Sequence, residues 1–141
     1  MPPLDSTDVQ LLTQIGFIAA GRGDVLRSQR IFSALALLRP HKAFPHIGMA
    51  CAWMNANQAM HAAQYLSEQN LPAGEDADLL DAFLALTLQI AGHTRRSQYM
   101  LDQLLQRTSS QPMGAARRMA LSMLGQLPTE SLTSTAMQES L

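Results

Sequence analysis

The chain has 141 residues, a formal net charge of −1 and one cysteine, which is enough length for a single domain with a buried core but no internal disulfide. Nucleic-acid binding usually requires a marked surplus of basic residues on one face, so the near-neutral charge disfavours it. The first ten residues lack a basic segment followed by an apolar one, and the uncharged run 43–67 is too short in its apolar part to span a bilayer, so we expect a cytoplasmic protein without membrane insertion.

Three helices are expected in the amino-terminal half. Ser6 or Thr7 can cap a first helix whose apolar residues recur at steps of three and four. The tetrapeptide GRGD ends it, with glycine as the stop and Asp24 as the cap of a second helix. That second helix should stop before Pro40, and a third should begin near Pro45, because proline is tolerated in a first helical turn.

Four further helices are expected at about 58–69, 77–91, 94–107 and 113–126. No run of alternating β-branched residues occurs, so the expected fold class is all-α, with about seven antiparallel helices joined by short turns. The Ser/Thr-rich tail 128–141 has little to bury and is expected to be disordered.

The helices also repeat with a period close to 34 residues, which is typical of tetratricopeptide repeats. We expect three such helical hairpins within residues 1–127, with Pro40 closing the first and the last helix acting as a cap. An irregular α-helical bundle is the alternative. The recurring small and large positions that carry the repeat are Gly16, Ala50 and Ala85, then Ser28, Ala62 and Ser97, then Phe32, Leu66 and Leu101.

In tetratricopeptide proteins the first helix of each hairpin lines the concave surface. The inferred surface is apolar and has no lysine or arginine, so a hydrophobic groove for a helix is favoured over a clamp for an acidic peptide. The alternative is that the fold, or a homodimer, buries these residues against itself. The expected partner-binding residues are Phe17, Phe44, Ile47, Cys51, Met54, Leu79, Ala82, Leu86 and Ile90, with Thr13, Ala20, Asn55 and Gln89 beside them.

Chemistry-bearing residues are sparse. His46, Cys51 and His61 match no tight zinc spacing, so the histidines are interpreted as surface or groove residues. Cys51 has no base nearby in sequence and is assigned to packing. The acids of EDAD at 75–78 suit a helix start. Neither an enzyme nor a cofactor or metal is expected.

The segment AGRGDVLRSQRIFSALALLRPHKAFPHIGMACAWMNANQAMHAAQYL resembles the small tetratricopeptide-like chaperones of bacterial type III secretion systems. The strongest part is IFSALALLRPHKAFPHIGMACAW, and the likeness covers about residues 11–105. Two branches fit. Needle-subunit chaperones hold the needle protein monomeric with a small helical co-chaperone, and they are favoured by the compact size. Translocator chaperones bind an extended segment of the translocator.

The resemblance implies a cytoplasmic bacterial chaperone that covers an amphipathic helix of a secreted protein. Its expected anchors are Phe44, Ile47, Met54 and Leu86. The rival function is a scaffold or adaptor that self-associates or links parts of a larger assembly. A homodimer in the absence of the client is left open.

Overall fold

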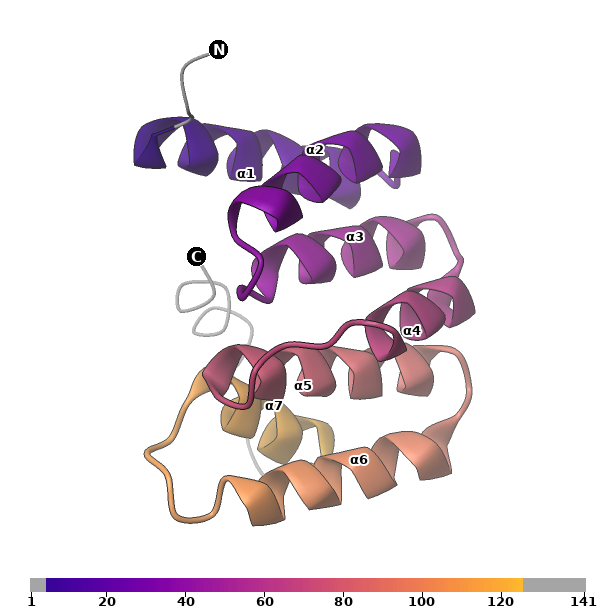
Figure 1. Cartoon of the computed structure of the whole chain (residues 1–141). Helices are drawn as coiled ribbons and strands as arrows, with labels where there is room; N and C mark the ends of the chain where they lie inside the picture. The colour runs from indigo at the N-terminus through magenta and orange to yellow at the C-terminus, as the bar shows by residue number, and fades with distance from the viewer. Residues whose placement is uncertain (1–4, 126–141) are drawn as a thin grey trace.

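The structure is a computed structural model, and it describes residues 5–125. These residues form seven α-helices and no strand, so the all-α fold class is confirmed (Figure 1). The expected tail 128–141 lies outside the described residues. The helices are α1 (Ser6–Gly21), α2 (Val25–Leu38), α3 (Phe44–Asn55), α4 (Ala59–Ser67), α5 (Glu75–Ile90), α6 (Thr94–Arg107) and α7 (Ala115–Met123).

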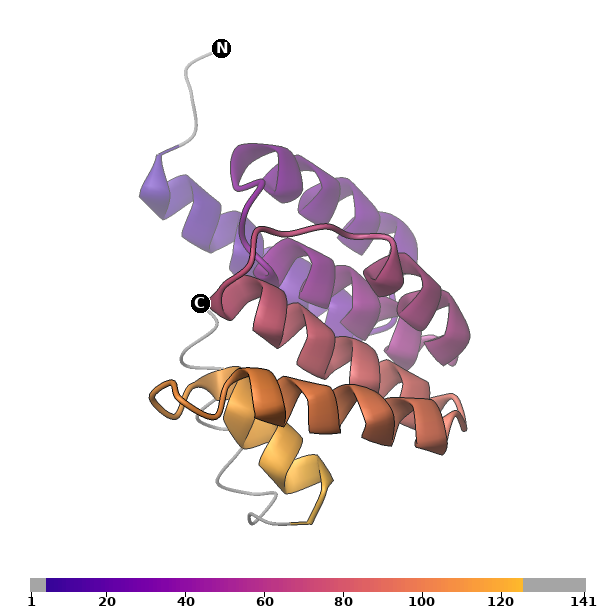
Figure 2. The same cartoon turned by 60° about the horizontal axis from the view of Figure 1, so that its bottom comes forward.

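The helices stack as hairpins along one direction, from α1 at one end to α6 and α7 at the other (Figures 1 and 2). The pairs α1–α2, α3–α4 and α5–α6 pack internally, and each second helix also packs on the first helix of the next pair. The first helices contact one another in the series α1–α3, α3–α5 and α5–α7. This contact pattern is the one expected for consecutive helical hairpins, each of which buries its apolar face against its neighbours.

The repeat seen in the sequence corresponds to buried packing positions. A small residue recurs where two helices approach closely, and a large residue fills the space beside it. Every member of the three series is buried. The small position of the first helices continues one period further, at Ala120 of α7, which is also buried. The seventh helix, expected as a cap, therefore occupies the place of the first helix of a fourth hairpin.

Phe32 of α2 shows why the small positions are needed. Its ring is 1% exposed and lies against Gly16 of α1 and Gly48 of α3, with the ring of Phe17 edge-on at 5.1 Å between centroids. A Cβ on Gly16 would lie 2.8 Å from Cζ of Phe32, and one on Gly48 would overlap the ring atoms. The two glycines thus make room for one aromatic ring between the first two hairpins.

Local signals set most helix ends. The cap of α1 is Asp5, not Ser6 or Thr7. The carboxylate of Asp5 accepts a hydrogen bond from the N–H of Asp8 at 2.8 Å, and the carboxylate of Asp8 accepts one from the N–H of Asp5. Asp24 caps α2, as expected, by accepting the N–H of Arg27. Gly92 has φ +92° and follows α5, as its expected stop.

The acidic residues at the start of α5 also bond to other parts of the chain, in addition to their favourable interaction with the helix dipole. The N–H of Ala43, which precedes α3, donates to Asp76 at 2.8 Å, and Lys42 lies 3.9 Å from the same carboxylate. The guanidinium of Arg107 on α6 donates to Asp78 at 3.0 Å and to Asp81 at 2.9 Å. The acidic segment therefore joins the second hairpin to the third and α5 to α6.

Candidate partner-binding face

One apolar position recurs at the same place in the first helices. Phe17 of α1, Cys51 of α3 and Leu86 of α5 are separated by 34 and 35 residues, and Leu121 of α7 follows 35 residues later. All four side chains are half-buried. Because each first helix contacts the next, these residues form a row across the stack. We call Phe17, Cys51, Leu86 and Leu121 the first-helix row.

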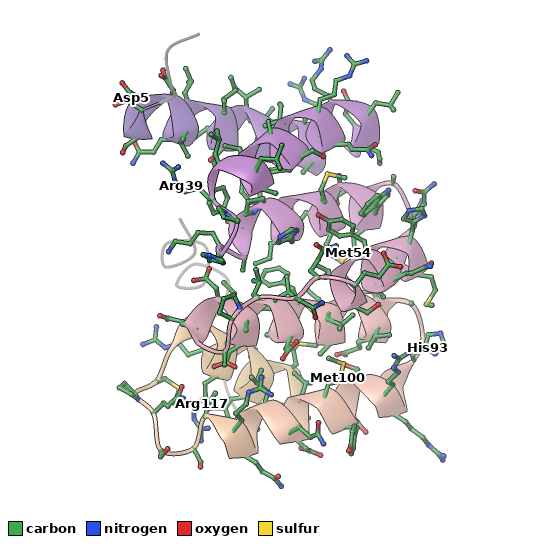
Figure 3. The ribbon with its side chains drawn as sticks, viewed as in Figure 1. Asp5, Arg39, Met54, His93, Met100 and Arg117 are labelled. Atoms are coloured by element: carbon green, nitrogen blue, oxygen red, sulfur yellow. The ribbon has the colours of Figure 1, made fainter. Side chains whose placement is uncertain are left out.

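Further apolar side chains lie beside this row. Phe44 and Met54, at the two ends of α3, are half-buried, and Met54 is labelled in Figure 3. Ile90, at the end of α5, is 57% exposed. Of the nine residues expected to contact a partner, six therefore keep some exposed surface. They are Phe17, Phe44, Cys51, Met54, Leu86 and Ile90.

The other three expected residues are part of the core. Ile47 is 4% exposed, Leu79 is 6% exposed and Ala82 is fully covered. The neighbouring helices cover them, so in this conformation they offer no surface to a partner. Ile47, expected as an anchor, therefore contributes to packing instead.

The flanking residues also have structural partners. The side chain of Thr13 is buried and donates to the carbonyl of Val9 at 2.6 Å. Asn55, although exposed, donates from Nδ2 to the carbonyl of Ala20 at 2.9 Å and so ties α3 to the end of α1. Gln89 is exposed. The apolar part of the face is therefore narrower than the sequence indicates.

The polar groups near this face lie in apolar or aromatic surroundings. Burial raises the pKa of the Cys51 thiol to about 11, which keeps the thiol protonated and unreactive at neutral pH. His46, expected at the surface or in the groove, is buried, and its Nδ1 lies 2.8 Å from the hydroxyl of Tyr65. Burial lowers the pKa of His46 and raises that of Tyr65 to about 12. His61 is exposed, and its ring lies tilted against that of Trp53, with 4.6 Å between the ring centroids.

A pocket of about 280 Å³ opens between the start of α5 and the α6–α7 connection. Two of its three charged side chains are engaged, and the third, Glu75, is exposed. Asp78 is paired with Arg107, and Arg117, labelled in Figure 3, donates to the carbonyl of Leu105 and the hydroxyl of Thr108. Within residues 5–125, no group of three His, Cys, Asp or Glu side chains could hold a metal ion.

Two features were missed in the sequence. Leu121 belongs to the first-helix row, and extending the 35-residue step beyond Leu86 would have found it. The outer side of α1 carries leucine and isoleucine side chains that the other described residues leave exposed, and helical periodicity alone could not show this.

Comparison with family models, curated proteins and solved structures finds no match to this chain. In the part of the chain that the structure describes, no helix is both long and apolar enough to cross a lipid bilayer.

Proposed function

We propose that this protein is a chaperone that holds an amphipathic helix of a partner protein along the first-helix row. The observation that carries the proposal is the recurrence of a half-buried apolar side chain at one position of four neighbouring first helices. If the residues of the row only packed the interior, we would expect them to be as fully buried as the residues that precede them in sequence, Gly16, Ala50 and Ala85.

The spacing of the row suits a helix of moderate length. Packed helices lie about 8–10 Å apart, so four adjacent first helices extend over roughly 25–30 Å. A helix rises about 1.5 Å per residue, so this distance corresponds to a partner helix of roughly 17–20 residues. Apolar residues of the partner at steps of three and four would meet the row along one face.

The character of the surrounding residues favours an apolar helix face over an acidic peptide. The four residues of the row are uncharged, and so are Phe44, Met54 and Ile90, which keep exposed surface beside it. Affinity would therefore come from buried apolar area, with Leu86, Met54 and Phe44 as anchors.

The resemblance of residues 11–105 to type III secretion chaperones gives this activity a biological setting. The client would be a secreted needle or translocator subunit, and a small helical co-chaperone could take part. Covering the apolar face of such a subunit in the bacterial cytoplasm would prevent its premature self-assembly. A scaffold or adaptor is the second candidate, and the exposed apolar side of α1 is the feature that favours it.

The test is co-expression with the neighbouring genes, followed by co-purification of whatever binds this protein. Leu86→Asp should lower client recovery by roughly tenfold or more, because a carboxylate would replace an anchor in an apolar contact. Leu37→Asp is the matched control, since Leu37 lies on the outer side of α2 and is 85% exposed.

Circular dichroism should show both variants folded. Equal recovery of the client with the wild-type protein and the Leu86→Asp variant would refute the assignment of the row. Recovery of large assembly components instead of a small helical protein would favour the adaptor.

A further inference from the structure

The first helix carries a second apolar surface. Leu11, Ile15 and Ile18 are 56%, 42% and 58% exposed, and at about 100° per residue they fall within about 60° of one another around α1. We call these three residues the α1 stripe. The buried residues Val9 and Gly16 lie on the opposite side of the same helix.

The equivalent residues of α3 are covered. One period after the α1 stripe come Pro45, Met49 and Ala52 of α3, all of which are buried. The helix α2 of the preceding hairpin packs on α3, and its Phe32 lies against Gly48, next to Met49 in sequence. The first hairpin has no described hairpin before it, so its stripe retains the apolar character of a helix-packing position without a helix on it.

Polar residues at the two ends of α1 indicate what can cover the stripe. Asp5 and Asp8 lie at its amino-terminal end and Arg22 directly follows its carboxyl-terminal end, and all three are exposed. If a second α1 lies antiparallel on the first, Leu11 comes opposite Ile18 of the other copy. Asp8 then lies within one residue of the other copy's Arg22, at both ends of the contact. A parallel pairing would instead place the acids of the two copies together.

We propose that the α1 stripe is the interface of a symmetric homodimer in which the α1 helices of two copies pack antiparallel. A two-fold axis makes each copy contribute the same surface, so the apolar contact and both charge pairs are satisfied at once. A single pair of four-turn helices buries less area than a standard interface, so the dimer is weak, with a dissociation constant of roughly tens of micromolar.

The interface is separate from the first-helix row. Phe17, the residue of the row on α1, lies about 100° around the helix from Ile18. The dimer can therefore form with the first-helix row free or occupied, and it does not depend on the proposed client.

The proposal is tested by sedimentation velocity of the full chain. The protein concentrations should range from below to above the expected dissociation constant. The wild-type protein should pass from monomer to dimer. Ile15→Glu should weaken the dimer by about tenfold to a hundredfold, because it buries a carboxylate at the centre of the contact. Its melting temperature at low concentration should change by only a few degrees, since Ile15 is 42% exposed in the monomer. Leu37→Glu, which alters a more exposed leucine on α2, should leave the dimer intact.

A charge exchange tests the antiparallel arrangement. Arg22→Glu alone should weaken the dimer, and adding Asp8→Lys should restore it, since the two charges then attract again in reversed order. A wild-type protein that stays monomeric well above the expected constant would overturn the proposal and leave the stripe to another chain. Equal weakening by Leu37→Glu, or failure of the double exchange to restore the dimer, would overturn the α1 interface or its antiparallel order.

Discussion

Gly48→Ala is expected to destabilise the fold, although alanine is normally the better helix former. In an exposed helix interior the change would gain about 1 kcal/mol. Here the added methyl group would overlap the ring atoms Cζ, Cε1 and Cε2 of Phe32. The ring is 1% exposed and also lies against Gly16, so it has little room to withdraw.

The size of the effect follows from these two opposing terms. Inserting a methyl group into a packed core costs about 1–3 kcal/mol, and the overlap here favours the upper end. After the gain in helix propensity, the net loss should be about 2 kcal/mol, or roughly 6–10 °C in melting temperature. Urea denaturation followed by circular dichroism measures it, with the slope m expected to stay constant.

Two further variants isolate the cause. Gly21→Ala, at the end of α1, places its methyl group with no atom within 4 Å, so it should be neutral or slightly stabilising. Phe32→Leu should relieve the overlap, so the double variant with Gly48→Ala should show a coupling energy of about 1–2 kcal/mol. The reasoning fails if Gly48→Ala is as stable as Gly21→Ala, or if the two core changes are additive.

Three further predictions concern polar groups. Burial lowers the pKa of His46, so the imidazole binds a proton more tightly in the unfolded chain than in the folded one, and the free energy of unfolding should fall as the pH drops below the ordinary pKa of 6.5. Urea midpoints at neutral and acidic pH measure this loss of stability, and His46→Gln should make the midpoint less dependent on pH. Asp76→Ala should lower the free energy of unfolding by about 1 kcal/mol, since it removes the acceptor for the N–H of Ala43. Asp76→Asn keeps an acceptor oxygen, so it should lower the free energy of unfolding by less in the same denaturation assay. The buried hydroxyl of Ser28 has no hydrogen-bond partner among the described residues, so Ser28→Ala should raise the urea midpoint by the equivalent of up to about 1 kcal/mol; a lower midpoint would mean that the hydroxyl is bonded.

Much of the fold could be predicted because its determinants are local. The expected range of the sixth helix, 94–107, agrees with α6, and Asp24 and Gly92 mark the ends of helices as expected. The expected start of the fifth helix was two residues late, and the expected seventh helix was longer than α7. Apolar spacing identifies a helix but loses precision at its ends, where single hydrogen bonds decide.

The candidate site was less accessible to such reasoning. Ile47 and Leu86 are both apolar and both belong to first helices, yet Ile47 is core and Leu86 is half-exposed. His46 was expected at the surface or in the groove, and it is buried against Tyr65, a residue of the next helix. Periodicity gives the direction in which a side chain points from its helix. It does not say how much of that side chain a neighbouring helix covers.

The sequence alone determined the helices, their pairing into hairpins and the positions where small residues let them approach, since these depend on interactions within a turn or on a fixed repeat length. The tertiary structure decided which apolar residues stay at the surface, and it joined Asp76 to Ala43 across 33 positions of the chain. Among residues 5–125, it places no helix over the α1 stripe. Burial depends on neighbours in space, and the periodicity of a single helix does not say which of its sides a neighbouring helix covers.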